Sequence, residues 1–268
     1  MEKKNAYNVL CGGITPIAPT DCGGIPMDIP TPSADTRPAT SGEEKPRLGA
    51  SGDSITELVF IIDRSGSMSG FEADTIGGFN SLIEKQKREV EGTAYVTTVL
   101  FDTERRMLHD RIPLSEVEPM TRREYFVGGC TALLDALGEA ITHIEKIHRY
   151  TDADRLPKNT VFVINTDGME NASREYSRER VKKMVEEKTE CCGWEFIFLG
   201  ANMDAIAAAR DIGIRRERAA GFEQSGAGYS DCYEAMSCFI SAKRCSAEAE
   251  ALDSWKEGLE NDENDDTR

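Results

Sequence analysis

The chain has 268 residues, of which 39% are apolar, and 48 Asp and Glu against 32 Lys and Arg leave a formal net charge of -16. Binding of nucleic acid through bulk electrostatics is excluded, because a phosphate backbone is held by clustered Lys and Arg that an acidic chain does not offer. A basic partner or a cation is the better expectation. One folded core flanked by tails would account for both the length and the modest apolar content.

Residues 1–53 hold seven of the ten prolines and seven glycines, and they show no helical or alternating period. This composition predicts a disordered tail. The tail repeats a Cys-Gly-Gly-Ile sequence, once from Cys11 and again from Cys22. Low-complexity drift is the preferred interpretation of the repeat, and a duplicated docking motif is the alternative.

The compartment is predicted from what the chain contains. The longest apolar runs fall far short of the roughly 20 residues that a membrane span needs, and no apolar segment of a secretion signal follows the first lysines. We therefore expect a cytoplasmic protein without a membrane anchor. The eight cysteines are expected to be thiols, and zinc is disfavoured because Cys191 and Cys192 are adjacent and no Cys-x-x-Cys pair occurs.

From residue 54 to residue 245, buried strands alternate with amphipathic helices. Strands are predicted at 57–63, 93–102, 105–112, 160–166, 194–200 and 219–223. Helices are predicted at 75–90, 131–150, 177–190, 204–212 and 228–243. The strand at 105–112 follows a short turn and is expected to be an antiparallel edge strand. The alternation predicts an α/β fold, a doubly wound Rossmann-like three-layer sandwich around a mostly parallel sheet.

Residues 246–268 carry nine acids against two bases, which predicts a frayed helix running into a solvated acidic tail. The three expected parts are therefore a Pro/Gly-rich tail at 1–53, the α/β domain at 54–245 and the acidic tail at 246–268.

Oxygen-bearing side chains follow the ends of two predicted strands, where doubly wound folds gather their function. Asp63, Ser65 and Ser67 lie at alternate positions of a tight turn after the first strand. Thr131 follows a Gly-Gly-Cys turn and opens the clearest helix, and Asp167 follows the strand at 160–166. An all-oxygen set of this kind suits a hard divalent cation, with Mg²⁺ or Mn²⁺ expected and zinc disfavoured.

Three fragments, residues 59–68, 128–137 and 165–168, resemble the von Willebrand factor type A domain, and most closely its soluble bacterial branch. They match the five positions of its metal-ion-dependent adhesion site (MIDAS): an Asp-x-Ser-x-Ser turn, a distant Thr and a distant Asp. The resemblance covers about residues 55–243. It implies that Ser65, Ser67 and Thr131 are hydroxyl ligands and that Asp63 and Asp167 act directly or through water. Cys130 stands where a third glycine is common, and this departure changes no ligand.

The resemblance implies a metal-dependent protein-binding module in which a Glu or Asp of the partner completes the coordination of the ion. An ion held by hydroxyls and water-linked carboxylates stays electrophilic, which favours such an incoming carboxylate. We expect no enzymatic activity. The alternative is a Mg²⁺-dependent phosphoryl-transfer enzyme on a similar sheet, but the chain lacks a phosphate loop and a nucleophile elbow, and Ser65 stands where a phosphatase usually has a second Asp. A third interpretation is a structural subunit whose metal only stabilises the fold.

Other polar residues carry less weight. Asp102 is expected to support the site or to belong to a turn, and Asp135 either favours the start of its helix or orients a water at the site. Arg64 is expected to point away from the site and to be available to a partner. Nine acids beside a carboxylate-binding site also raise a hypothesis of Mg²⁺-dependent self-association, although a solubilising tail is preferred. The three histidines are expected to be solvated: His109, His143 and His148.

Overall fold

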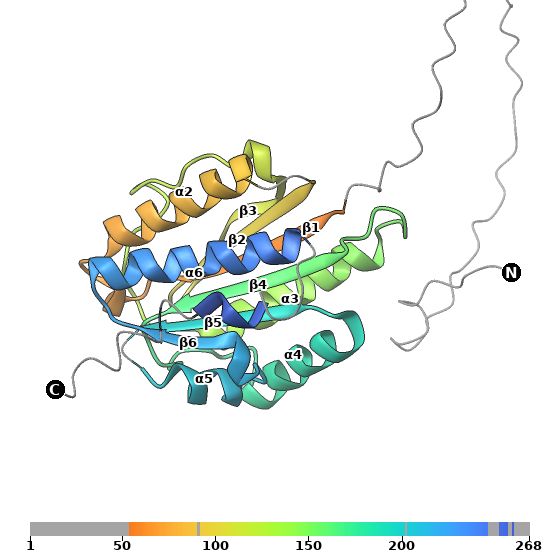
Figure 1. Ribbon diagram of the computed structural model, residues 1–268. Coiled ribbons are helices and arrows are strands. Elements are labelled where there is room, and N and C mark those ends of the chain that lie inside the picture. The colour runs from red at the N-terminus through yellow and green to blue at the C-terminus, as the bar shows by residue number, and fades with distance from the viewer. Residues whose placement is uncertain (1–53, 90–91, 202, 246–251, 257–258, 260–268) are drawn as a thin grey trace, which may run out of the picture. The chain divides into compact units, whose positions relative to one another are not determined.

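The computed structural model describes residues 54–89, 92–201, 203–245, 252–256 and 259 (Figure 1). The predicted disordered tail at 1–53, with its Cys-Gly-Gly-Ile repeat, lies outside the described residues. The bounds of the α/β domain at 54–245 stay a prediction.

Six strands form one sheet in the order β3-β2-β1-β4-β5-β6. The neighbouring strands are parallel except β2 and β3, which are antiparallel, so the predicted edge strand is confirmed. The chain runs from β1 outward to β2 on one side and later to β4 on the other, so the strand order reverses beside β1. The strand bounds are β1 Thr56–Asp63, β2 Ala94–Phe101, β3 Arg105–Pro113, β4 Asn159–Thr166, β5 Glu195–Ala201 and β6 Ala219–Phe222.

Helices cover both faces of the sheet, with α2 and α6 on one face and α3, α4 and α5 on the other (Figure 1). Successive side chains of a strand point to opposite faces, so Phe60 of β1 packs in the core under α2 and α6 while Ile61 packs in the core under α3. The fold is therefore the expected three-layer, doubly wound α/β sandwich. The helix bounds are α2 Glu72–Glu89, α3 Leu133–Arg149, α4 Arg178–Cys192, α5 Ala205–Asp211 and α6 Gly226–Arg244.

Two histidines do not lie where the sequence analysis expected them. His109 on β3 is buried, its Nδ1 lies 3.0 Å from Thr98 Oγ1, and burial lowers its pKa. His148 on α3 is buried, and its ring forms a T-shaped contact with the Trp194 ring. The prediction of solvated histidines is wrong for these two, because the helix and strand faces that carry them are covered. His143 is partly exposed and lies 2.7 Å from Asp110 Oδ1.

The antiparallel edge strand β3 is irregular. Its pairing with β2 shifts register on both sides of Thr98, and Arg111 has a left-handed φ of 48°, which is uncommon for a residue other than glycine. The irregularity places the Arg111 guanidinium 2.8 Å from the carboxylate of Glu57, a fully buried residue of β1. Arg111 also lies over the Tyr95 ring. The bulge therefore brings the cation that this buried carboxylate requires.

Part of the predicted acidic tail packs on the domain. Leu252, Trp255 and Leu259 are buried, and the Trp255 indole donates a hydrogen bond of 3.1 Å to the carbonyl of Glu217. The Trp255 ring also meets the Phe239 ring of α6 edge to face. The rest of the acidic tail lies outside the described residues, so the self-association hypothesis stays a prediction.

The described ranges contain no helix that is long and apolar enough to cross a membrane. The cysteines in these ranges are free, as the sequence analysis expected of the thiols.

Candidate metal site

The turn after β1 brings the first three predicted site residues together. Asp63 ends the strand and is fully buried, and its Oδ1 accepts a hydrogen bond of 2.7 Å from the backbone N–H of Ser65. The Ser65 and Ser67 hydroxyls lie 3.0 Å apart. The alternation of the Asp-x-Ser-x-Ser sequence therefore turns three oxygen-bearing side chains toward one place.

The end of β4 joins this turn, since β4 lies directly beside β1 in the sheet. The Ser67 hydroxyl donates a hydrogen bond of 2.6 Å to Asp167 Oδ1, across a sequence separation of 100 residues. Thr166, which sequence analysis missed, donates its hydroxyl to Asp63 Oδ2 at 2.5 Å. Both carboxylates of the predicted set are thus held by hydroxyl groups.

Thr131 reaches the same place from the loop before α3. A Cβ added to Gly168 would lie 2.6 Å from Thr131 Oγ1 and 3.3 Å from Ser67 Oγ, so the two hydroxyls face one small space beside Gly168. The Thr131 carbonyl accepts hydrogen bonds from the backbone N–H groups of Asn171 and Ala172. These bonds explain why α3 begins at Leu133 and not at Thr131 as predicted.

Burial disfavours the ionised forms of Asp63 and Asp167, and a bound cation would favour them. Burial raises the pKa of Asp63 to about 6, although hydrogen bonds from Thr166 and Ser65 act in the opposite direction. Burial also raises the pKa of Asp167, against hydrogen bonds from Ser67 and Gln224. A nearby cation favours the ionised form of a carboxyl group, so its binding would reverse both shifts.

Gln224 is a further residue of the site that the sequence analysis missed. It lies in the loop between β6 and α6, and its side-chain amide donates to Asp167 Oδ2 at 2.6 Å and to the Ser67 carbonyl at 3.3 Å. Asp167 is therefore held at both oxygens. No motif marks this glutamine, because its place depends on how the last strand lies against the rest of the sheet.

The prediction that Arg64, between two candidate ligands, is available to a partner is wrong. It is buried, its Nε lies 3.0 Å from Asp102 Oδ2, and its guanidinium lies over the Phe126 ring. Asp102 also accepts the backbone N–H of Glu104, so it belongs to the turn after β2 and fixes Arg64. The end of β1 is held by a further contact, in which the hydroxyl of buried Tyr125 donates a hydrogen bond of 2.7 Å to the Asp63 carbonyl.

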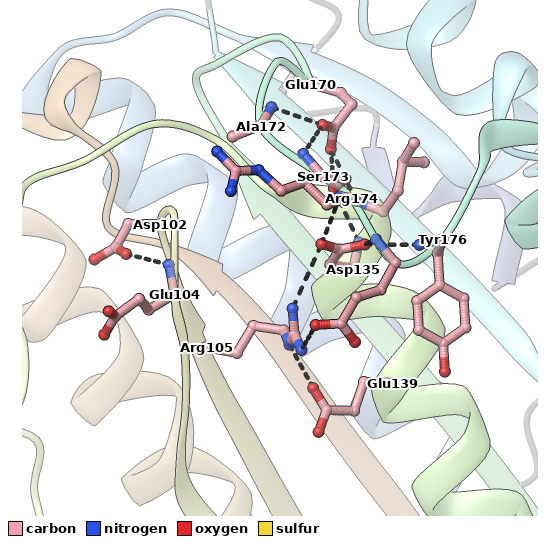
Figure 2. Close-up of polar contacts among 12 residues, drawn as sticks. Asp102, Glu104, Arg105, Asp135, Glu139, Glu170, Ala172, Ser173, Arg174 and Tyr176 are labelled. Atoms are coloured by element: carbon pink, nitrogen blue, oxygen red, sulfur yellow. Dashed lines mark hydrogen bonds and ion pairs between the residues drawn. The ribbon is translucent and has the colours of Figure 1, made fainter.

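The loop that follows Asp167 is fixed by Asp135 of α3 (Figure 2). The Asp135 carboxylate accepts three backbone N–H groups, from Arg174, Glu175 and Tyr176, each at 2.8 Å. The Arg105 guanidinium lies 3.5 Å away on its other side. Burial works to raise the pKa of Asp135, but these hydrogen bonds and the guanidinium outweigh it, so the pKa lies below its usual value. Asp135 is therefore a loop anchor, beyond the two roles that the sequence analysis left open.

Glu170 fixes the same loop from within (Figure 2). Its two oxygens accept the backbone N–H groups of Ala172 and Ser173, the Ser173 hydroxyl, and the N–H of Leu134 in the first turn of α3. Since the loop begins with Asp167, these bonds fix the position of a candidate ligand relative to Thr131. The anchoring residues lie on two segments that are 30 or more residues apart, which sequence analysis did not connect.

The donor chemistry fits a hard divalent cation. The five predicted side chains offer two carboxylates and three hydroxyls, all of them oxygen ligands. The described ranges contain no group of three or more His, Cys, Asp or Glu side chains that could hold a metal ion, so a site of the zinc type is not found there. Gly168 adds the space that a side chain would otherwise fill next to the Thr131 hydroxyl.

A sheet of this order, with an Asp-x-Ser-x-Ser turn at the end of its first strand, defines a von Willebrand factor type A (VWA) domain. The profile of one family in this class, "VWA domain containing CoxE-like protein", matches residues 45–194. This match covers more than half of the chain, and the chain belongs to this family.

Solved structures with a similar fold share little sequence with the chain. Proximal thread matrix protein 1 from the mussel byssus, in the form with a zinc-occupied MIDAS motif, is 15% identical over 69% of this chain and 45% of its own, with a TM-score of 0.48. A von Willebrand factor type A protein from Catenulispora acidiphila is 13% identical over 69% of this chain and 42% of its own, with a TM-score of 0.46. BatB from Bacteroides thetaiotaomicron is 14% identical over 72% of this chain and 100% of its own, with a TM-score of 0.44.

The chain spans less than half the length of the mussel and Catenulispora proteins that it matches. No curated protein matches it.

Proposed function

We propose that residues 54–245 form a metal-dependent protein-binding module whose MIDAS holds Mg²⁺ or Mn²⁺ and binds a Glu or Asp of a protein partner. The ligands would be Asp63, Ser65, Ser67, Thr131 and Asp167. The observation that carries the proposal is that oxygen-bearing side chains from three separate segments meet: the Ser67 hydroxyl contacts Ser65 and Asp167, and it faces the space beside Gly168 together with the Thr131 hydroxyl. Membership of a VWA family supports it.

The chemistry of this ligand set favours binding over catalysis. Hydroxyl ligands leave the charge of a divalent ion largely uncompensated, so the ion attracts a carboxylate from outside. The Ser65 and Ser67 hydroxyls contact each other, Ser67 also contacts Asp167, and no His or Lys nitrogen contacts either hydroxyl in the described part of the chain. We therefore propose no nucleophile and base pair here, and expect Asp167→Ala to leave any background hydrolysis of nucleotides and phosphomonoesters unchanged.

Metal binding is tested by thermal unfolding of the full chain in EDTA, in Mg²⁺ and in Mn²⁺. A ligand present at 100 times its dissociation constant stabilises the native state by about 2.7 kcal/mol. For a domain of this size that corresponds to roughly 5 to 11 °C in melting temperature. We expect this rise in the wild type and in the control Glu118→Ala, an exposed acid away from the site, and no rise in Asp63→Ala. An equal rise in Asp63→Ala would refute the assignment of the ligands.

Partner binding separates a receptor from a subunit in which the metal is only structural. Affinity capture by the wild type in Mg²⁺, in EDTA, and by Asp63→Ala is compared at a temperature where all three are folded. The proposal expects a partner that is retained only by the wild type in Mg²⁺ and that is released by free glutamate-containing peptide. Retention in EDTA would show that the metal takes no part in recognition.

A further inference from the structure

A cavity of about 200 Å³ opens beside the proposed metal site, between the first turn of α3, the loop after β4 and helix α5. Cavities that bind metabolites are usually about 300 to 1,000 Å³, so this one is small for a cofactor and fits a single side chain. We call it the Gly168 pocket. Its apolar lining includes Leu133, Met169, Phe198, Met203, Ala207 and Ile212.

The charged groups that line the Gly168 pocket are already paired within the protein. Glu170 accepts backbone N–H groups through both of its oxygens, and Asp204 accepts the N–H of Ala207 at the start of α5. The carboxylate of Asp211 lies 2.6 Å from the Arg178 guanidinium. A polar ligand would have to compete with these internal contacts, whereas an apolar side chain would lose only water. The pocket therefore selects for an apolar group.

Gly168 is shared between the pocket and the metal site. It lines the pocket, and the space beside its Cα is the one that Thr131 Oγ1 and Ser67 Oγ face. Next to it, Met169 is 75% exposed. Phe126 is 52% exposed and lies against Arg64, the residue between the candidate ligands Asp63 and Ser65. Exposed Met and Phe side chains are typical of protein interfaces, and here both lie next to the candidate ligands.

We propose that the Gly168 pocket receives an apolar side chain of leucine or methionine size from the same partner segment whose carboxylate binds the metal. The inference rests on the proposed function and adds the second feature by which the partner is recognised. In an extended segment, residues two apart point to the same side, about 7 Å from each other. Because Gly168 lines the pocket and also adjoins the candidate hydroxyl ligands, the two are near enough for such a pair, and the partner's sequence would carry an apolar residue two positions from its Glu or Asp.

The test is an NMR titration of the full chain, isotopically labelled, with three synthetic peptides in Mg²⁺. The first peptide carries one glutamate and one leucine two residues apart in a glycine-serine background. In the second the leucine is replaced by serine, and in the third the glutamate is replaced by glutamine. We expect the first peptide to bind about tenfold tighter than the second, because burying a leucine side chain contributes at least that factor. The first should shift the amide signals of both Gly66 and Ala207, and the second only that of Gly66.

Two matched variants locate the effect. Ala207→Phe fills the pocket from α5, and Arg210→Phe adds the same ring to an exposed position of α5 that does not line the pocket. We expect Ala207→Phe to bind the first peptide no better than the second, and Arg210→Phe to keep the tenfold difference. Equal affinities of the two glutamate peptides for the wild type, both abolished by EDTA, would refute the pocket and leave the metal site intact. Binding that persists in EDTA or with the glutamine peptide, or no Mg²⁺-dependent shift at millimolar peptide, would refute the proposed function and this inference with it.

Discussion

The anchoring of the loop after β4 by Asp135 makes a quantitative prediction for Asp135→Asn. Asparagine keeps one acceptor oxygen but turns an NH₂ group toward the third backbone N–H, which is left without a partner. An unsatisfied buried donor costs about 1 to 3 kcal/mol, and the remaining hydrogen bonds lose the strength that the negative charge gave them. We expect a loss of about 3 kcal/mol in the free energy of unfolding, which is roughly 6 to 12 °C in melting temperature for a domain of this size.

Thermal and urea unfolding at pH 7 measure this loss, and Glu139→Gln is the control. Glu139 contacts the same Arg105, but its side chain is 54% exposed, so its loss should cost less than about 1 kcal/mol. Because the pKa of Asp135 lies below its usual value of 3.8, its contribution is present at neutral pH and is lost only in strong acid, as the pH falls through the folded-state pKa. A melting temperature of Asp135→Asn within about 2 °C of the wild type at pH 7 would refute the anchoring role.

Single substitutions at three further places should change the stability of the fold or its affinity for metal. Two neighbouring glycines of helix α2 should respond in opposite ways to alanine, as measured by urea unfolding. Gly77→Ala adds a Cβ in open space and should stabilise the fold by about 0.5 to 1 kcal/mol. Gly78→Ala adds a Cβ 2.1 Å from a ring carbon of Tyr233 and should destabilise the fold by about 1 to 3 kcal/mol. Trp255→Ala removes a ring that is 5% exposed and should cost about 3 to 5 kcal/mol in the free energy of unfolding, and a loss below about 1 kcal/mol would show that the packing of Trp255 does not stabilise the domain. Gly168→Ala places a Cβ 2.6 Å from the candidate ligand Thr131 Oγ1, so we expect a folded protein with weakened Mn²⁺ binding in isothermal titration. An unchanged affinity would show that the metal does not bind beside Gly168.

The fold could be predicted from the sequence because the period of its apolar residues changes with each element. Strand β1 is buried on both sides, which requires an unbroken apolar run from Leu58 to Ile62, and α3 shows its buried face at intervals of three and four residues. Helix ends were harder to place. Helix α2 begins at Glu72 and not near Thr75 as predicted, with Glu72 and Asp74 in a first turn that favours negative charge.

The candidate site was predictable to the extent that its residues fall in local motifs. The Asp-x-Ser-x-Ser turn is one short contiguous segment and the residues after β4 are another, so the spacing within each segment shows which side chains can converge. Gln224 and Glu170 could not be found in this way, because each acts on a segment that only the folded sheet brings near. Arg64 was misplaced for a related reason. Alternation correctly pointed it away from the ligands, but the direction away from them leads to buried Asp102 and not to solvent.

The irregular strand β3 affects whether copies of this protein can associate through the edges of their sheets. A regular strand at the edge of a sheet offers unpaired backbone groups to any other extended chain. Strand β3 is a poor template for such pairing, because it contains a bulge, a left-handed Arg111, several charged side chains and a final Pro113. At the opposite edge, β6 is only four residues long. Neither edge can readily accept an added strand, which disfavours pairing of two copies through the edges of their sheets.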